Sequence, residues 1–136
     1  MRTPFAFSAI AILLVVAALL GGCTLAEPTT TPVPTPDIPR VRFLFPENNA
    51  RIAQDSEITV DILAEDETSG IARVEFLVDN IQINEGQPDG FAVPAFRAAM
   101  NWIAGTPGGH TLHAIAYRAD GTRSDEAIIL VDVVAR

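Results

Sequence analysis

Short runs of alternating apolar and polar residues recur throughout the sequence after residue 40, and they constrain the fold more than any other feature. The runs are separated by Gly, Pro, Asn and Asp, which favour turns. No long segment in this part has apolar residues three and four positions apart behind a capping residue, as an amphipathic helix would. The pattern therefore predicts an all-β domain.

Seven of these runs have the length and composition of strands. We expect strands at residues 41–45, 57–64, 72–79, 81–84, 96–103, 111–118 and 127–134. Because side chains alternate across a strand, Val60 shares a face with Ile62, and Val74 shares a face with Phe76. Short strands at this spacing are typical of two sheets packed face to face. Residues 40–136 are therefore predicted to form a β-sandwich of about seven antiparallel strands.

The same region resembles the bacterial immunoglobulin-like domains. The resemblance rests on three stretches in the family's order: FLFPENNARI, EITVDILAEDETSGIARVEFLVDN and GTPGGHTLHAIAYRADGTRSDEAIILVDVV. It implies an immunoglobulin-like sandwich. The domain has no cysteine pair, and Trp102 lies late in the sequence, so it departs from the antibody pattern. The fold hosts many unrelated functions, so the resemblance implies no particular ligand.

The first 22 residues have the layout of a signal peptide. Arg2 supplies a positive charge, residues 5–20 are apolar and uncharged, and small residues precede Cys23. The apolar run is shorter than the roughly 20 residues that a spanning helix needs. Residues 20–23 resemble the bacterial lipobox, which implies cleavage before Cys23 and a lipid on its thiol. We therefore expect a lipid-anchored protein on the extracytoplasmic face of a cell membrane; the alternative is an ordinary signal peptide, or an uncleaved anchor, with a chance cysteine at its end.

Residues 23–39 are expected to form an extended spacer after the lipidated cysteine. Proline recurs at positions 28, 32, 34, 36 and 39 among threonines. Each proline fixes φ and removes a hydrogen-bond donor, which favours polyproline II. At about 3.1 Å per residue, such a spacer reaches roughly 50 Å. A stalk is the favoured interpretation, and a ligand for an aromatic groove is the alternative.

The charge of the chain excludes one class of partner. Seventeen acidic residues face nine basic ones, all arginine, giving a net charge of −8. Loss of Arg2 with the signal peptide would take the balance to 8 − 17 = −9. Because an acidic surface repels phosphate backbones, no nucleic-acid partner is expected.

Three carboxylates, Asp66, Asp89 and Asp120, fall in loops that we expect to meet at one end of the sandwich. Clustered carboxylate oxygens suit Ca²⁺, so a calcium site is one interpretation. Asp is also an ordinary turn residue, and no calcium loop of fixed spacing is present. No other cofactor is expected. His110 and His113 are three apart on an expected strand, so they point to opposite faces and cannot form a chelate.

Phe91, Trp102 and Tyr117 are candidate binding residues. Exposed together on one face, their rings would form a platform for stacking sugars; alternatively, Trp102 fills the core. No Ser, Thr or Cys has a recognisable nucleophile setting, so an enzyme is not expected. The sequence thus predicts a non-catalytic cell-envelope lipoprotein that displays a binding or structural module. The alternatives are a polysaccharide-binding module and an adhesion or assembly partner of another envelope protein.

Overall fold

The structure, a computed structural model, describes residues 33–136 and confirms the predicted all-β sandwich. The predictions for residues 1–32, including Cys23, lie outside the described residues. No helix in the described part is long and apolar enough to cross a membrane. Its strands are β1 (Arg40–Phe45), β2 (Ala50–Ala53), β3 (Glu57–Glu65), β4 (Arg73–Val78), β5 (Ile81–Gly86), β6 (Ala95–Ile103), β7 (Gly108–Tyr117) and β8 (Ala127–Val134).

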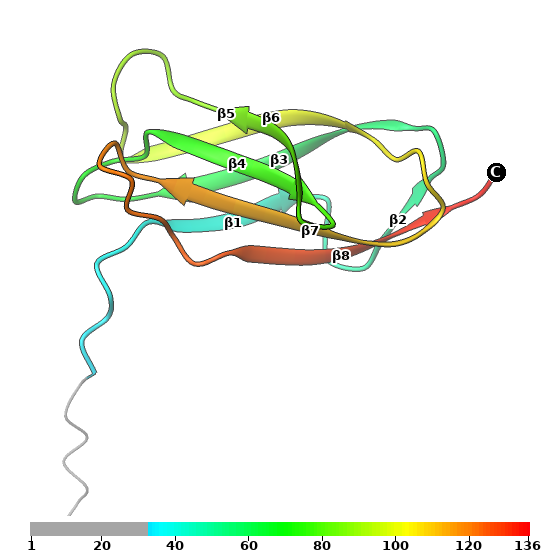
Figure 1. Ribbon diagram of the computed structural model, residues 1–136, viewed down its shortest axis with the longest axis horizontal. Coiled ribbons are helices and arrows are strands. Elements are labelled where there is room, and N and C mark those ends of the chain that lie inside the picture. The colour runs from blue at the N-terminus through cyan, green and yellow to red at the C-terminus, as the bar shows by residue number, and fades with distance from the viewer. Residues whose placement is uncertain (1–32) are drawn as a thin grey trace, which may run out of the picture. The chain divides into compact units, whose positions relative to one another are not determined.

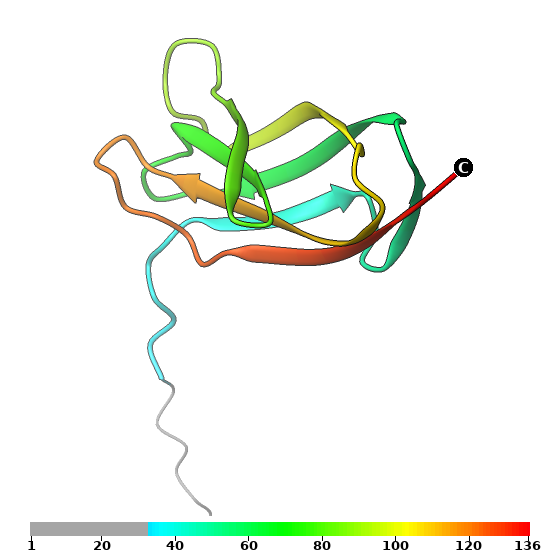
Figure 2. The same ribbon diagram turned by 45° about the vertical axis from the view of Figure 1, so that its right-hand side comes forward.

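The strands form two sheets that pack as layers. One sheet has the order β1-β3-β6 and the other has the order β2-β8-β7-β4-β5. Figure 1 shows the five-stranded sheet nearer the viewer, and Figure 2 shows the two layers from a second angle. All neighbouring strands run antiparallel except β2 and β8, which run parallel.

The β2 strand is an eighth strand, beyond the seven expected from the sequence, and it pairs parallel with β8. It has four residues, and only Ile52 among them is buried, so it carries too little alternation to be recognised. Its pairing with β8 joins Ala50 to Val131, far along the chain. The backbone N–H of Asn49 extends this contact by donating to the Leu130 carbonyl at 2.7 Å. The strand therefore depends on a tertiary partner that its own sequence does not reveal.

The core lies between the sheets and consists of the residues that alternation assigned to the inner faces. Phe76 at the middle of β4 is fully buried, and Ile62 on β3 and Leu112 on β7 are buried with it. All of the buried core cluster lies within the compact unit Thr35–Arg136. Because the unit contains its own core, we expect it to fold without the residues that precede it.

One end of the sandwich gathers three connections and the entering chain, and we call it the loop pole (Figure 1, left). It comprises residues 35–39, 66–72, 87–94 and 118–126. Ile71 and Val93 exchange backbone hydrogen bonds of 2.7 and 3.1 Å across two of these loops. Gly70 sits where they meet, with φ +78° and an ideal Cβ position 3.1 Å from the backbone of Ala92, so this close approach requires glycine. The three loops thus meet at one pole, as the sequence predicted.

At the opposite end of the sandwich, which we call the distal pole, His110 contacts Asp79 and Thr106. Its Nδ1 lies 2.6 Å from the carboxylate of Asp79, and its Nε2 lies 2.7 Å from the carbonyl oxygen of Thr106. Both neighbours are acceptors, so the ring satisfies both contacts only when both nitrogens carry protons. The hydrogen bond to Asp79, aided by the Thr106 carbonyl, raises the pKa of His110 above its usual value. The rings of Trp102 and His110 pack in a T-shaped arrangement, with centroids 6.0 Å apart.

Because of the hydrogen bond between His110 and Asp79, we expect the domain to lose stability in mildly alkaline solution. The folded-state pKa of His110 lies above the unfolded value of about 6.5. The stabilisation is therefore fully present below about pH 6.5 and is lost as the pH rises through the folded pKa. Urea unfolding from pH 6 to 9 should show this loss in the native sequence and not in the His110→Gln variant. Parallel pH profiles of the two proteins would contradict the prediction.

Candidate functional site at the loop pole

Arg118, the first residue after β7, is the centre of the loop pole. Its guanidinium donates to both carboxylate oxygens of Asp66, with Nε–Oδ2 at 2.6 Å and Nη2–Oδ1 at 3.1 Å. The side chains are 8% and 3% exposed, so this is a buried, bidentate ion pair. The hydrogen bonds from Arg118 lower the pKa of Asp66, and those to Asp66 and Asp37 raise the pKa of Arg118.

The same arginine holds the segment through which the chain enters the sandwich. Its Nη2 donates to Asp37 at 2.8 Å, and the Thr68 hydroxyl donates to the same carboxylate oxygen at 3.0 Å. Pro39 is fully buried. Asp37 and Pro39 both belong to the spacer that was expected to end at residue 39. In the structure these residues contact the sandwich, and the compact unit begins at Thr35.

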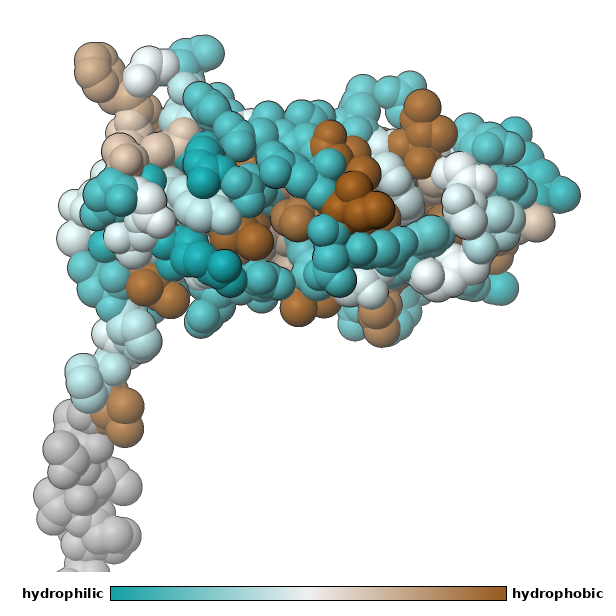
Figure 3. Space-filling view, viewed as in Figure 1, coloured by the Kyte–Doolittle hydropathy of each residue, from teal (hydrophilic) through white to brown (hydrophobic). Residues whose placement is uncertain are grey.

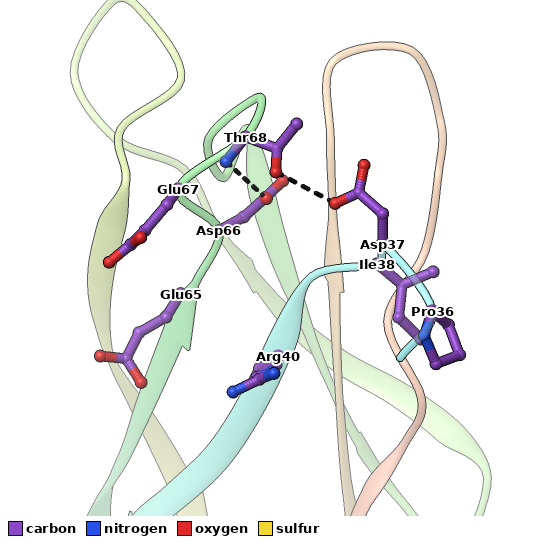
Figure 4. A pocket seen from close by; sticks show the side chains of 8 residues that line it. All are labelled: Pro36, Asp37, Ile38, Arg40, Glu65, Asp66, Glu67 and Thr68. Atoms are coloured by element: carbon purple, nitrogen blue, oxygen red, sulfur yellow. Dashed lines mark hydrogen bonds between the residues drawn. The ribbon is translucent and has the colours of Figure 1, made fainter. Parts of the chain in front are cut away.

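A cavity of about 350 Å³ lies between this segment and the loop after β3 (Figure 4). Figure 4 shows the carboxylates of Glu65 and Glu67 on one side of it, with the side chain of Arg40 beneath them. Asp66 turns away from them, and its Oδ1 accepts a hydrogen bond from the backbone N–H of Thr68 at 3.1 Å. The cavity is therefore lined by exposed charges of both signs.

Asp66, Asp89 and Asp120 do not form a ligand set in the structure. The Asp66 carboxylate accepts hydrogen bonds from Arg118. Asp120 accepts a hydrogen bond from the backbone N–H of Thr122 at 2.9 Å within its own turn. Residues 33–136 contain no group of three or more His, Cys, Asp and Glu side chains placed to hold a metal ion. The three loops meet at one pole, but the Asp66 carboxylate points to an internal arginine, so this geometry gives the calcium interpretation no support.

Phe91, Trp102 and Tyr117 do not form a shared aromatic platform either. Trp102 is 8% exposed and belongs to the core, because its position on β6 faces inward. Tyr117 is half-buried: the guanidinium of Arg73 lies 3.7 Å from its ring centroid, and its hydroxyl donates to Glu75 at 2.9 Å. Phe91 alone of the three is fully available, at 89% exposed, in the loop between β5 and β6.

Arg118 and Asp37 were not among the site residues predicted from the sequence. The two residues are 81 positions apart, and Arg118 is 52 positions from Asp66. An arginine after a strand and an aspartate in a proline-rich segment both resemble ordinary solvated residues. No local spacing could have linked them, because only the packing of the sheets brings the three segments together.

The comparison with protein families agrees with this architecture. A profile described as "Bacterial Ig domain" matches residues 39–114, which is more than half of the chain. The chain belongs to the bacterial Ig domain family. The predicted immunoglobulin-like sandwich is therefore confirmed, and the match begins at Pro39, the buried residue that precedes β1.

Solved structures share the Ig-like fold at low sequence identity. The fibronectin(III)-like modules of Clostridium thermocellum CbhA are 23% identical, with a TM-score of 0.59, and the match covers 71% of this chain and 98% of that one. The SrpA adhesin of Streptococcus sanguinis, in its R347E mutant, is 15% identical, with a TM-score of 0.54 and coverage of 76% and 61%. The endo-β-1,4-mannanase of Thermotoga petrophila is 13% identical, with a TM-score of 0.54 and coverage of 72% and 20%.

These likenesses establish the fold of the Ig-like unit and nothing about its ligand. No curated protein sequence matches the chain. The Ig-like unit resembles a whole module in the first of these structures and only part of a longer chain in the other two.

Proposed function

We propose that this protein is a non-catalytic cell-envelope lipoprotein that displays one Ig-like binding or structural module outside the cytoplasmic membrane. In this proposal Cys23 carries the lipid, and the proline- and threonine-rich segment holds the module away from the bilayer. Two acyl chains on one cysteine are enough for stable anchoring.

The observation that carries the proposal is the way the chain enters the module. Residues 35–39 enter the unit at the loop pole, where Arg118 and Thr68 donate hydrogen bonds to Asp37 and where Pro39 is buried. The last strand, β8, ends at the distal pole (Figure 1). A module held at one end in this way presents its far end and its sheet faces to the surroundings.

The anchor is tested by the mass and location of the protein. In bacteria that process lipoproteins, the full chain should appear in the membrane fraction, starting at residue 23 with a lipid-sized increase in mass. A Cys23→Ser variant should lose both the lipid and the processing. An unmodified Cys23 on a full-length chain would overturn the proposal, because the N-terminal segment would then itself be the anchor.

An adhesion or assembly role is the second candidate, and Phe91 favours it. Phe91 is 89% exposed at a loop, so its ring buries little surface within this domain. Aromatic residues of this kind are common anchors of protein interfaces. If the envelope partner retained by the native module is retained equally by Phe91→Ala, this candidate loses its support.

A further inference from the structure

The outer face of the five-stranded sheet has a second hollow, near the distal pole. It has a volume of about 380 Å³ and lies over β7, β8 and the turn before β2. We call it the β7–β8 hollow and define it by Asn49, Gly109, Thr111, Leu130 and Asp132. Figure 3 views this face and shows hydrophilic and near-neutral residues toward the C-terminal end, with apolar residues nearer the middle.

The hollow includes one position on the sheet surface, Gly109, that has no side chain. Gly109 pairs with Asp132, and Thr111 pairs with Leu130, so the four positions form a square on the outer face. Gly109 has no positive φ, and a Cβ built on it would meet nothing within 4 Å. Neither the backbone nor the packing therefore requires glycine here. A larger side chain at this position would project into the hollow.

Three polar side chains around this gap have spare hydrogen-bonding capacity. Within the described residues, neither the side-chain amide of Asn49 nor the hydroxyl of Thr111 makes a hydrogen bond. In the same part of the chain, Asp132 has only a loose contact with Arg51 at 3.6 Å. Leu130, 52% exposed, adds an apolar surface beside them. The backbone around them is fixed, because Leu130 accepts from the N–H of Asn49 and donates to Asn48 at 2.9 Å.

We propose that the β7–β8 hollow binds one unit of a neutral polysaccharide. A carboxylate accepts from two adjacent sugar hydroxyls, an amide and a hydroxyl both donate and accept, and an aliphatic side chain packs against the C–H face of the ring. Asp132 and the acidic charge of the chain disfavour anionic sugars. This inference names a ligand for the binding role proposed above and rests on that role, while the test below does not involve the lipid anchor.

The test is an NMR titration of the isotope-labelled unit 33–136 with cellohexaose, mannohexaose and hexa-N-acetylchitohexaose at millimolar concentration. At least one of these sugars should shift the amide signals of Asn49, Gly109, Thr111 and Asp132. Gly109→Val should place a side chain in the hollow and weaken binding about tenfold or more without lowering the melting temperature, and Asp132→Ala should weaken it similarly.

Gly105→Val is the matched control. Gly105 also lies near the distal pole with open space around its Cα and no positive φ, but it is outside the hollow. This variant should bind like the native unit. The proposal is overturned if none of the three sugars shifts the four signals, if the shifts lie elsewhere, or if Gly109→Val and Asp132→Ala bind as tightly as the control. A failed lipidation experiment would leave this result unchanged, so the two proposals fail separately.

Discussion

Replacing Asp66 with alanine is expected to lower the free energy of unfolding by about 1–3 kcal/mol, the usual cost of leaving a buried hydrogen-bonding group without its partner. The Asp66 carboxylate is 3% exposed and receives two hydrogen bonds from Arg118 and one from the backbone N–H of Thr68. Its removal leaves the Arg118 guanidinium buried with only the more exposed Asp37 as a partner. Chemical denaturation of the unit 33–136 measures the loss.

Asp89→Ala is the control for this prediction. Asp89 lies in an exposed loop of the same pole, so its replacement should change the free energy of unfolding by less than about 0.5 kcal/mol. Acid should act in the same direction as Asp66→Ala. Because the hydrogen bonds from Arg118 lower the pKa of Asp66, the stabilisation is present above about pH 4 and is lost as the pH falls through the folded value. Equal effects of the two variants would contradict a structural role for the Asp66–Arg118 pair.

Replacing Phe76 with alanine should cost about 3–5 kcal/mol, through lost burial and the cavity that remains. Phe76 is fully buried at the middle of β4, which lies between β5 and β7 in the five-stranded sheet. Its neighbours belong to both sheets and to fixed strands, so they have little freedom to close the gap. Equilibrium unfolding in urea, together with the midpoint of thermal unfolding, measures the effect.

Phe91→Ala provides the same chemical change at a site that is 89% exposed. We expect it to leave stability within about 0.5 kcal/mol of the native value. A small loss at Phe76, comparable with that at Phe91, would mean that the packing around β4 is looser than the structure indicates.

The strands and the core followed directly from the sequence, because alternation is a local property. Positions such as Val60, Ile62, Val74 and Phe76 are buried as their spacing predicted. Side chains two positions apart point to the same face of a strand, so the buried face can be read from the local pattern and no tertiary information is needed. The β2 strand escaped prediction for the opposite reason, since its hydrogen-bond partner is the distant β8.

The sites behaved differently, because they depend on which loops and strands meet. The sequence predicted that Asp66 and Asp120 lie at one pole, yet it gave no sign that Arg118 would occupy Asp66 and hold Asp37. The burial of Trp102 likewise depends on the face that β6 turns inward.

The sequence by itself determined the all-β class, the sandwich, its family resemblance and its core, since each depends on short-range periodicity and turn residues. The tertiary structure alone decided the ion pair at the loop pole, the docking of Asp37 and the hollow around Gly109. Each of these joins residues that are far apart in the chain, and their distances are set only when the two sheets pack.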